Sequence, residues 1–317
     1  MARRFQLKRL TDFVNTTLCE DDIYQTKISD FLIRCPNCKS TNLICRGWRR
    51  NKRKGAIRIY SCKDCGRKFS DTFPGHLPLH IVSDIFDLAV RGMAPGDIAE
   101  IISKRYGSLF DVSPQTIMNI IKRWIRLFQK FEDKRKHKLN SEEWQIDDTP
   151  QIFPKSTKNS RCIWITNVLA VEPRYWLSAY VSEQRTEKAS ILALELAYKR
   201  AKYGPVRFRC DGYKGHKSAI HKVFPFAMID SKSKEEDFGH INLIESLHSF
   251  IRRSGIKKRG RFRSIENLQA FLELVRVYHN FLRPHGAIGT TPAARVGIAP
   301  MFSSWNDLLR YVHRHLK

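Results

Sequence analysis

Three acidic residues in the second half of the chain interrupt segments that are otherwise apolar. Asp147 ends Trp-Gln-Ile-Asp, Asp211 ends Val-Arg-Phe-Arg-Cys-Asp, and Glu245 lies within Ile-Asn-Leu-Ile-Glu-Ser-Leu. The first two close short β-prone runs and the third breaks a helical apolar pattern, so we expect all three carboxylates at the rim of one core. Carboxylates held together repel one another unless a positive charge lies between them. Hard oxygen ligands of this kind favour magnesium, with water and phosphate completing its shell.

The charge of the chain indicates a polyanionic partner. Its 317 residues carry 57 Lys and Arg against 31 Asp and Glu, a net charge of +26, and this excess favours nucleic acid. A membrane surface is the alternative, but we find no Lys-rich amphipathic helix, and the longest apolar stretch, near residues 162–171, is too short to span a bilayer. The first ten residues have no apolar segment typical of a secretory signal. We therefore expect a cytoplasmic protein, associated with the nucleoid in a prokaryote.

Length and a hydrophobic content of 42% suit two or three domains with cores of their own. We predict an architecture of several domains joined by short linkers. The expected parts are a basic segment (1–30), a zinc ribbon (31–74), a helix-turn-helix domain (78–131), an α/β catalytic domain (140–298) and a helical tail (299–317).

Two C-x-x-C pairs, Cys35 with Cys38 and Cys62 with Cys65, are separated by 23 residues. Two intervening residues let both thiolates of a pair reach one tetrahedral zinc ion, and the loop between the pairs can fold as a β-hairpin. Four protein ligands leave no open position, so this zinc is expected to be structural. A redox pair or four unrelated buried thiols is the alternative.

The expected tip of that hairpin is strongly basic. Its five cations are Arg49, Arg50, Lys52, Arg53 and Lys54. Such a cluster is typical of a phosphate contact, and a merely solvated loop is the alternative.

Residues 81–131 carry three apolar stripes at helical spacing. Ser113 followed by Pro114 is a strong signal for the start of the third helix. Three helices of this size suggest a helix-turn-helix, and plain packing of three helices is the alternative. In a helix-turn-helix, the start of the third helix reads base edges and its later cations contact phosphate. The base-facing candidates are Gln115, Thr116 and Asn119, and the phosphate-facing candidates are Lys122 and Arg123.

The rest of the chain predicts a β-meander followed by alternating helices and strands, which indicates an α/β sheet with helices on its faces. The expected strands are 144–147, 163–171, 175–181 and 206–211, and the expected helices are 186–202, 214–221 and 241–253. If the strands ending at Asp147 and Asp211 are parallel neighbours, their tips lie about 4.8 Å apart. Open α/β sheets place their sites at such strand ends.

The helix around Glu245 tests this arrangement. Asn242, Glu245, His248 and Arg252 form one polar stripe on a helix that is otherwise apolar. A helix of this kind is buried, so its polar stripe must face something polar, and a metal site meets that requirement. We interpret His248 as a packing residue or a hydrogen-bond donor rather than a general base, and we assign no role to His216 or His285.

Five short motifs follow one another along the second half of the chain. They are Trp-x-x-Asp (144–147), Cys-Asp-Gly (210–212), Asn-x-x-Glu-x-x-His-x-x-x-Arg (242–252), Tyr-His-Asn-Phe-Leu-Arg-Pro-His (278–285) and Thr-Pro-Ala (291–293), with 33 residues between Asp211 and Glu245. Over roughly residues 35–298 this order resembles DDE insertion-sequence transposases of the retroviral-integrase superfamily.

The resemblance implies an RNase H-like fold with a mixed five-stranded sheet and cut-and-join chemistry on double-stranded DNA. It also implies two magnesium or manganese ions held by Asp147, Asp211 and Glu245, and a homodimer or larger assembly that brings transposon ends and target DNA together. The motif Asp147-Asp148-Thr149 departs from the Asp-Glu-Thr common in the family. Strand alternation and the motif register select Asp147 over Asp148.

A run of cations follows Glu245 without an intervening acid and is expected to hold the flanking DNA. The members that we expect to contact DNA are Arg252, Arg253, Lys257, Lys258 and Arg259. Two other functions remain open: an RNase H-like structure-selective nuclease without strand transfer, and a DNA-binding regulator whose nuclease-like domain is inactive.

Overall fold

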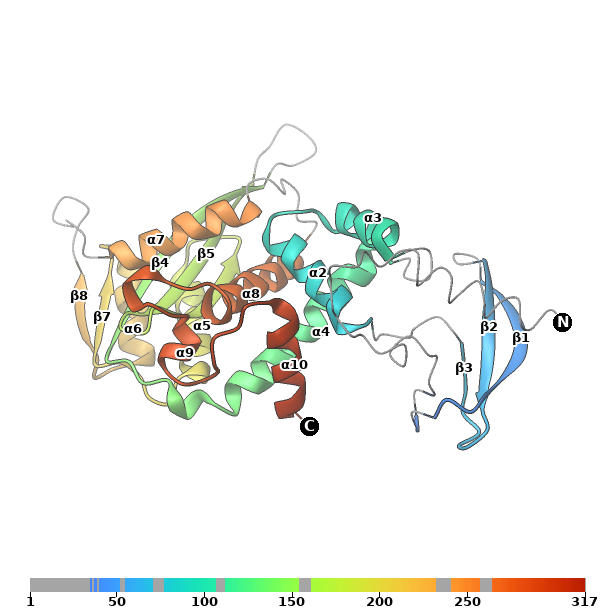
Figure 1. The fold of residues 1–317 in the computed structure, drawn as a ribbon. Coiled ribbons are helices and arrows are strands. Elements are labelled where there is room, and N and C mark those ends of the chain that lie inside the picture. The colour runs from blue at the N-terminus through green and yellow to red at the C-terminus, as the bar shows by residue number, and fades with distance from the viewer. Residues whose placement is uncertain are drawn as a thin grey trace. The chain divides into compact units, whose positions relative to one another are not determined.

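The computed structural model describes residues 35, 37, 38, 40–51, 55–70, 77–106, 112–153, 161–231, 241–256 and 264–316. Contacts divide the chain into two compact units, residues 1–74 and 75–317 (Figure 1). The predicted basic segment 1–30 lies outside the described residues, as do the side chains of the basic hairpin tip and the later part of the second basic run. These side chains belong to Arg49, Arg50, Lys52, Arg53, Lys54, Lys257, Lys258 and Arg259.

The first unit contains a three-stranded antiparallel sheet, β1 (Leu43–Asn51), β2 (Gly55–Cys62) and β3 (Lys68–Ser70). Pairing of β1 with β2 runs from Leu43 opposite Cys62 to Asn51 opposite Gly55, with a bulge between Cys45 and Gly47. The hairpin expected between the two cysteine pairs is therefore present. Its open end lies next to Cys62.

Three helices begin the second unit, α2 (Leu79–Val90), α3 (Pro95–Tyr106) and α4 (Pro114–Asp133). The predicted start of α4 is confirmed, because Ser113 Oγ accepts a hydrogen bond from the Thr116 amide at 3.1 Å. Each helix buries its apolar stripe. The three predicted helices are present, whereas recognition of DNA by them stays a prediction.

A five-stranded sheet forms the centre of the second unit, in the order β6-β5-β4-β7-β8. β4 (Glu143–Phe153), β5 (Arg161–Ala170) and β6 (Tyr175–Ser182) form an antiparallel meander. β7 (Arg207–Cys210) is parallel to β4, and β8 (Met228–Ser231) is parallel to β7. The predicted mixed five-stranded sheet is confirmed.

Strand β4 is longer than predicted. The apolar run suggested an end at Asp147, but β5 pairs with β4 as far as Phe153 opposite Arg161. The pairing of β4 with its parallel partner β7 does end next to Asp147, because its last pair is Ile146 opposite Cys210. Asp147 therefore lies within β4, at the point where its neighbour stops.

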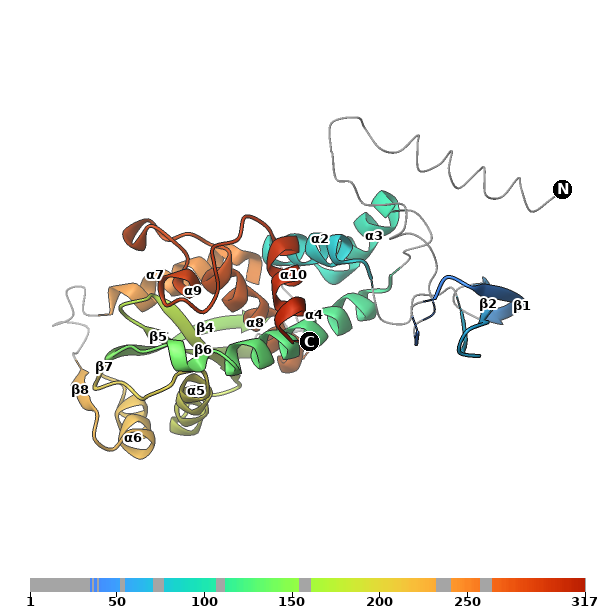
Figure 2. The same cartoon turned by 60° about the horizontal axis from the view of Figure 1, so that its bottom comes forward.

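Helices cover both faces of the sheet (Figure 2). α5 (Glu187–Arg200) and α6 (Lys214–Val223) lie on one face, and α7 (Asn242–Ile251) lies on the other with α8 (Ile265–Phe281). The short elements are η3 (Lys136–Lys138), η4 (Arg252–Ile256), η5 (Gly286–Ile288) and α9 (Pro292–Arg295), and the last helix is α10 (Trp305–Leu316).

Helix α8 also covers the outer edge of the sheet. Asn280 accepts a hydrogen bond from the Trp176 amide and donates one to the Trp176 carbonyl, both at 2.9 Å. Gln269 accepts from the Val181 amide at 3.0 Å and donates to the Ala179 carbonyl at 2.7 Å. These side chains satisfy backbone groups that an edge strand otherwise leaves free.

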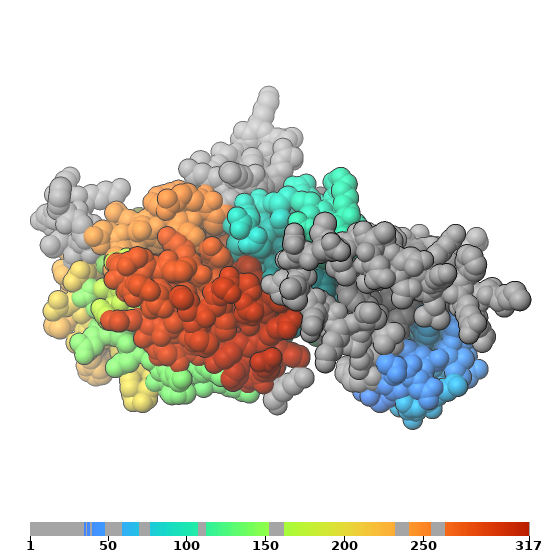
Figure 3. All heavy atoms as spheres, in the orientation of Figure 1, coloured from blue at the N-terminus to red at the C-terminus, as the bar shows by residue number. Residues whose placement is uncertain are grey.

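One apolar core runs from α2 through the sheet to α10. The surface of the last segment lies beside that of α2, which α10 contacts (Figure 3). Helices α2–α4 thus share a compact unit with the sheet, and the finer boundaries expected at residues 131–140 and 298 stay predictions. Among the described residues, every helix is too short or too polar to cross a membrane.

A buried ionic network joins α4, α5 and α8. The fully buried Arg276 donates to both carboxylate oxygens of Glu132, at 2.7 and 2.6 Å, and its Nε donates to Glu273 at 3.0 Å. Arg200 donates to the same Glu273 oxygen at 2.7 Å, and the Tyr175 hydroxyl donates to Glu132 at 2.6 Å. The network fixes the last turns of α4 against the α/β layer.

Because two carboxylates would be left buried without their shared partner, we expect Arg276→Met to lower the free energy of unfolding by about 3 to 5 kcal/mol. Chemical denaturation followed by tryptophan fluorescence measures the change. Glu100→Gln is the control, since the Glu100 and Lys104 side chains are 64% and 75% exposed and their pair contributes at most about 1 kcal/mol. Equal stability of Arg276→Met and the wild type would contradict a structural role for the network.

Candidate active site

Parallel pairing of β4 and β7 brings two carboxylates together. Ile146 is the partner of Cys210 in this ladder, so the next residues along each strand are Asp147 and Asp211. The two strands are parallel neighbours, which was the condition for these acids to meet, although Asp147 lies within β4 and only Asp211 follows its strand. Asp211 lies just past the end of β7, and its Oδ1 accepts a hydrogen bond from the Tyr213 amide at 3.1 Å.

Asp148 is fully engaged by the protein. Thr166 donates to its Oδ1 at 2.5 Å, Arg185 Nε donates to its Oδ2 at 2.8 Å, and His216 Nε2 lies 3.3 Å from Oδ2. Burial alone would raise the pKa of Asp148, but the nearby His216 ring and the hydrogen bonds from Thr166 and Arg185 lower it to about 2. Asp148 is therefore a permanently ionised group whose charge is already compensated.

Asp147 is in the opposite situation. Its Oδ1 accepts a hydrogen bond from the Asp148 amide at 2.7 Å. Burial raises the pKa of Asp147 to about 7, the negative charges of Asp211 and Asp148 add to this effect, and the Asp148 amide and His216 oppose it. An ionised Asp147 is thus poorly compensated by the described residues, and a cation placed there would stabilise it.

Arg185 bridges the two strands that carry the acids. Besides its contact with Asp148, its Nη2 donates to Asp211 Oδ2 at 2.8 Å. The guanidinium carbon lies 4.1 Å from the centre of the Tyr213 ring. A Cβ on Gly215 would come within 2.4 to 2.7 Å of that ring, so glycine at 215 allows Tyr213 to occupy this place.

His216 completes a group of three possible metal ligands. One ligand atom from each of Asp147, Asp211 and His216 lies within 4.8 Å of the others. The His216 side chain is fully buried, Ser190 Oγ lies 2.9 Å from Nδ1, and Nε2 has no hydrogen-bond partner with acceptable geometry among the described residues. The ring is thus held from one side while Nε2 faces the acids.

Helix α7 approaches the same region from the other face of the sheet. Gln145, two residues before Asp147, accepts a hydrogen bond from the Ile244 amide at 3.0 Å and so fixes the start of α7 against β4. His248 Nδ1 lies 3.7 Å from Asp147 Oδ2. Burial, with the charge of Arg252, lowers the pKa of His248 to about 4, which leaves the ring neutral at pH 7.

Glu245 lies one turn before His248 on this helix and is exposed. It is not a member of either group of mutually close ligand atoms found among the described residues. The structure therefore brings Asp147 and Asp211 together with His216, and it places the helix of Glu245 beside them. Ligation by Glu245 stays a prediction.

The donor set fits a hard divalent cation. Carboxylate oxygens suit magnesium and manganese, and an imidazole nitrogen adds a ligand that manganese accepts. The poorly compensated Asp147 and the orphaned His216 Nε2 are the two groups whose surroundings a cation would improve.

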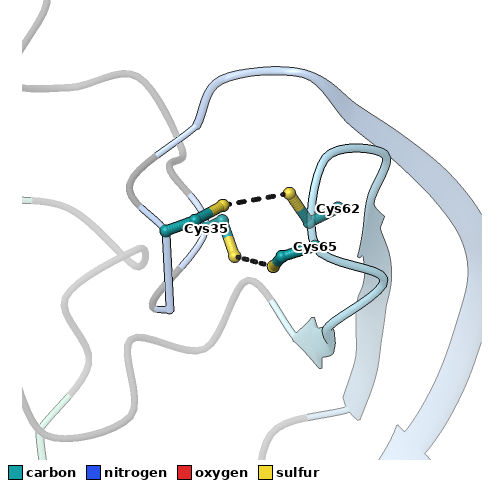
Figure 4. A group of neighbouring side chains, drawn as sticks. Cys35, Cys62 and Cys65 are labelled. Carbon is teal, nitrogen blue, oxygen red and sulfur yellow. Dashed lines mark hydrogen bonds between the residues drawn. The ribbon is translucent and has the colours of Figure 1, made fainter.

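The four cysteines of the first unit also converge. Cys35 Sγ lies 3.4 Å from Cys65 Sγ, and Cys38 Sγ lies 3.5 Å from Cys62 Sγ, so the thiols from the two turns face one another (Figure 4). Zinc–sulfur bonds of about 2.3 Å imply sulfurs about 3.8 Å apart in a tetrahedron. The cluster fits zinc with a small outward adjustment.

The residues predicted to read bases lie exposed on the first turns of α4. Gln115 donates to Asn119 at 3.0 Å, and the Thr116 hydroxyl lies 2.9 Å from that of Ser113. Lys122 and Arg123, later on the same helix, are half-buried, whereas Arg252 and Arg253 after α7 are exposed. Their contact with DNA remains a prediction.

Sequence analysis missed Arg185, Thr166 and Ser190, and it assigned no role to His216. Thr166 and Arg185 hydrogen-bond to Asp148, and Ser190 contacts His216. Each contact joins side chains from separate elements, so no local pattern predicts it. The one local signal was the spacing of His216, five residues after Asp211 on the helix that follows the strand.

Scans against protein-family models and curated proteins found no match. Three solved retroviral structures are similar in fold. The catalytic core domain of BIV integrase is 15% identical, with a TM-score of 0.34 over 56% of this chain and 100% of that chain. The HTLV-2 integrase catalytic core domain in complex with magnesium is 13% identical, with a TM-score of 0.36 over 50% and 97%.

The third is the simian T-cell lymphotropic virus intasome in complex with PP2A regulatory subunit B56 gamma. It is 12% identical, with a TM-score of 0.38 over 64% of this chain and 74% of that chain. All three TM-scores lie below 0.5. The function proposed below therefore rests on the geometry of the site and not on these three similarities.

We expect Asp147 to titrate near neutral pH in magnesium-free protein. Because the folded state raises its pKa from 3.8 to about 7, its contribution to stability is present below pH 4 and is lost as pH rises toward 7. NMR titration of carboxyl carbons measures this pKa. Asp211→Asn removes a repelling charge and should lower it, whereas the exposed Asp307→Asn should not. Titration of Asp147 near pH 4 in the wild type would overturn this account of its surroundings.

Proposed function

We propose that the protein is a transposase, a metal-dependent enzyme that cleaves DNA at the ends of an insertion sequence and joins those ends to target DNA. The observation that carries the proposal is the placement of Asp147 and Asp211 on adjacent parallel strands, with the charge of Asp147 poorly compensated. The mixed sheet agrees with the RNase H-like fold that the sequence resemblance implies. The excess of 26 positive charges supports DNA as the substrate.

Asp147 and Asp211 would hold the divalent ions, with Glu245 reaching them from α7 and His216 offering an additional ligand atom. When bound, the ions would ease deprotonation of the attacking oxygen and stabilise charge on the leaving oxygen. In the joining step, a 3′-hydroxyl oxygen forms the new bond to phosphorus and loses its proton to solvent. The target's bond from phosphorus to its 3′ oxygen breaks, and that oxygen takes up a proton from solvent.

The neighbouring side chains prepare this site without taking part in bond changes. Arg185 holds Asp148 and Asp211 at a fixed separation through two hydrogen bonds of 2.8 Å. Ser190 orients the His216 ring. We assign the metal-binding role to Asp147 rather than Asp148, because Asp148 already accepts hydrogen bonds from Thr166 and Arg185.

DNA contacts are proposed from two regions. Gln115, Thr116 and Asn119 on α4 would read base edges, and Lys122 and Arg123 would contact phosphates. Arg252 and Arg253 extend from the end of α7 and would hold the strand beside the carboxylates. A dimer or larger assembly would bring two ends together.

The cysteine cluster is proposed to hold one structural zinc ion, since four thiolates complete a tetrahedron. Binding would tie the turn at Cys35 to the open end of the β1–β2 hairpin. The order of this small sheet would then depend on the metal.

The decisive assay is manganese-dependent joining of labelled duplexes, carrying the ends of the element that encodes the chain, to a plasmid. We expect Asp211→Asn and Glu245→Gln each to reduce joining by about 100-fold or more, because direct ligands matter at least as much as the groups that orient them. The control is Glu195→Gln, an exposed change on α5. Cleavage without joining would indicate a nuclease, and binding without either reaction would indicate a regulator. Full activity of Glu245→Gln would contradict the role of Glu245 alone.

Zinc content is a separate expectation. Purified protein should contain one zinc ion per chain by mass spectrometry, and Cys62→Ser should lose it and make the first unit sensitive to protease. Structural zinc contributes about 10 kcal/mol or more to folding. Cys162→Ser, outside the cluster, should keep the metal. A zinc-free wild type with an intact, protease-resistant first unit would refute this assignment.

A further inference from the structure

A polar cavity lies beside α7, and its lining does not include the carboxylates of the candidate active site. It has a volume of about 160 Å³ and is lined by the end of β5, the turn before β6, α7, the end of α8 and the loop after α8. Its polar lining residues are Arg174, Ser246, His279, Arg283 and His285. We call it the histidine pocket. A liquid water occupies about 30 Å³, so the space exceeds that of a few waters.

Two of the lining residues are imidazoles that each have a buried nitrogen without a described partner. The rings of His279 and His285 lie 4.4 Å apart between centres. His279 is 3% exposed, its Nε2 lies 3.1 Å from the Arg174 carbonyl, and its Nδ1 has no hydrogen-bond partner among the described residues. His285 Nε2 is likewise buried without a described partner. Buried polar atoms are rarely left in this state, so a water or a bound group is expected beside them.

The charge around the pocket is positive. Arg174 and Arg283 form no ion pair with any described residue, and Arg283 lies against the Phe250 ring at 4.3 Å. No carboxylate lines the described part of the cavity. The nearest acid along the turn, Glu172, lies 3.4 Å from Arg295 instead. Two uncompensated guanidinium groups beside empty space favour an anion and disfavour a cation.

The titratable groups facing the imidazoles explain their neutral state. Burial lowers the pKa of His279 well below its usual value, and His285 and the guanidinium groups of Arg283 and Arg276 add to this. Burial likewise lowers the pKa of His285 to about 4, with Arg283 and Arg174 contributing. From α7 the lining is apolar apart from Ser246. An anion would offset the two arginines and favour protonated rings, which can donate hydrogen bonds.

The position of the pocket indicates where the anion comes from. Leu243, Ser246 and Leu247 of α7 line it, while His248 on the same helix lies 3.7 Å from Asp147. One helix, about 10 Å wide, therefore separates the pocket from the candidate active site. A DNA strand that reaches both positions needs only a few nucleotides, given its rise of 3.4 Å per nucleotide.

We propose that the histidine pocket binds one backbone phosphate of the DNA strand engaged at the active site, and that this binding takes up a proton. The proposal rests on the proposed function for the identity of the anion. It also assigns a role to the motif Tyr-His-Asn-Phe-Leu-Arg-Pro-His at 278–285, which supplies both imidazoles and one guanidinium.

Two measurements on the full chain test the proposal. The first is the melting temperature with inorganic phosphate against chloride at equal ionic strength. The second is the affinity for a labelled duplex by fluorescence anisotropy, as a function of salt and pH. Arg283→Gln keeps much of the side-chain volume, and Arg310→Gln, on the exposed face of α10, is the control with equal loss of charge. Melting curves without phosphate check that both variants fold.

We expect phosphate to stabilise the wild type and Arg310→Gln but not Arg283→Gln. DNA affinity of Arg283→Gln should fall about tenfold relative to Arg310→Gln, with a salt dependence weaker by about one phosphate contact. Wild-type affinity should rise as pH falls from about 8 to about 6, and His285→Gln should reduce that rise, since His285 can take up the proton only when the anion binds.

Each other outcome overturns the proposal in a distinct way. Equal DNA affinity and salt dependence of the two arginine variants would exclude a backbone phosphate. If inorganic phosphate still stabilised the wild type in that case, the pocket would be a site for a free anion. Stabilisation by zinc or nickel ions that Cys62→Ser retains and His285→Gln loses would indicate a metal site. Absence of DNA binding by the wild type would contradict the proposed function itself, while the phosphate measurement would still decide the chemistry of the pocket.

Discussion

The parallel pairing of β4 with β7 is the constraint on which the candidate site depends. It fixes Asp147 and Asp211 as the next residues after a hydrogen-bonded pair, Ile146 and Cys210. Burial and the neighbouring charge of Asp211 raise the cost of ionising Asp147. The protein compensates part of that charge with Arg185 and leaves Asp147 poorly compensated. The fold thus creates a negatively charged site at Asp147 and Asp211, and a bound cation would balance its charge.

Helix α7 connects the carboxylate site to the rest of the second unit. Gln145 fixes the start of α7 next to Asp147, and His248 lies against the same carboxylate from the other face of the sheet. The far side of the helix forms a wall of the histidine pocket. The buried network around Arg276 holds α8, from which the other wall extends, against α4. The carboxylates, the pocket and the helical segment that precedes the sheet are therefore parts of one packed unit.

Most of the secondary structure could be predicted because its signals are local. Ser113 and Pro114 predicted the start of α4, and apolar runs predicted β5, β6 and β7 within one or two residues. The end of β4 could not be predicted in this way, because pairing with β5 carries the strand past Asp147 to Phe153. The approach of four cysteines followed from their spacing, since a C-x-x-C turn places two thiols together whatever its surroundings are.

The details of the site depended on contacts between distant elements. Asp147 and Asp211 were found because each closes an apolar run, and their pairing required only parallel neighbours. Arg185 lies between elements, and no local pattern separates it from the many other cations of the chain, whereas His216 had only its spacing after Asp211 as a local signal. Glu245 was placed on the correct helix from its polar stripe, yet the stripe alone does not give the distance from its carboxylate to the other two.

The central claim is that Asp147 and Asp211 together bind a divalent cation. Titration of the full chain with Mn²⁺, followed by electron paramagnetic resonance of the free ion, tests it without requiring activity. We predict saturable loss of the free-ion signal with the wild type, and much weaker binding with Asp211→Asn. Arg310→Gln, which leaves both acids intact, should bind like the wild type. Equal binding of Mn²⁺ by the wild type and Asp211→Asn would contradict the claim.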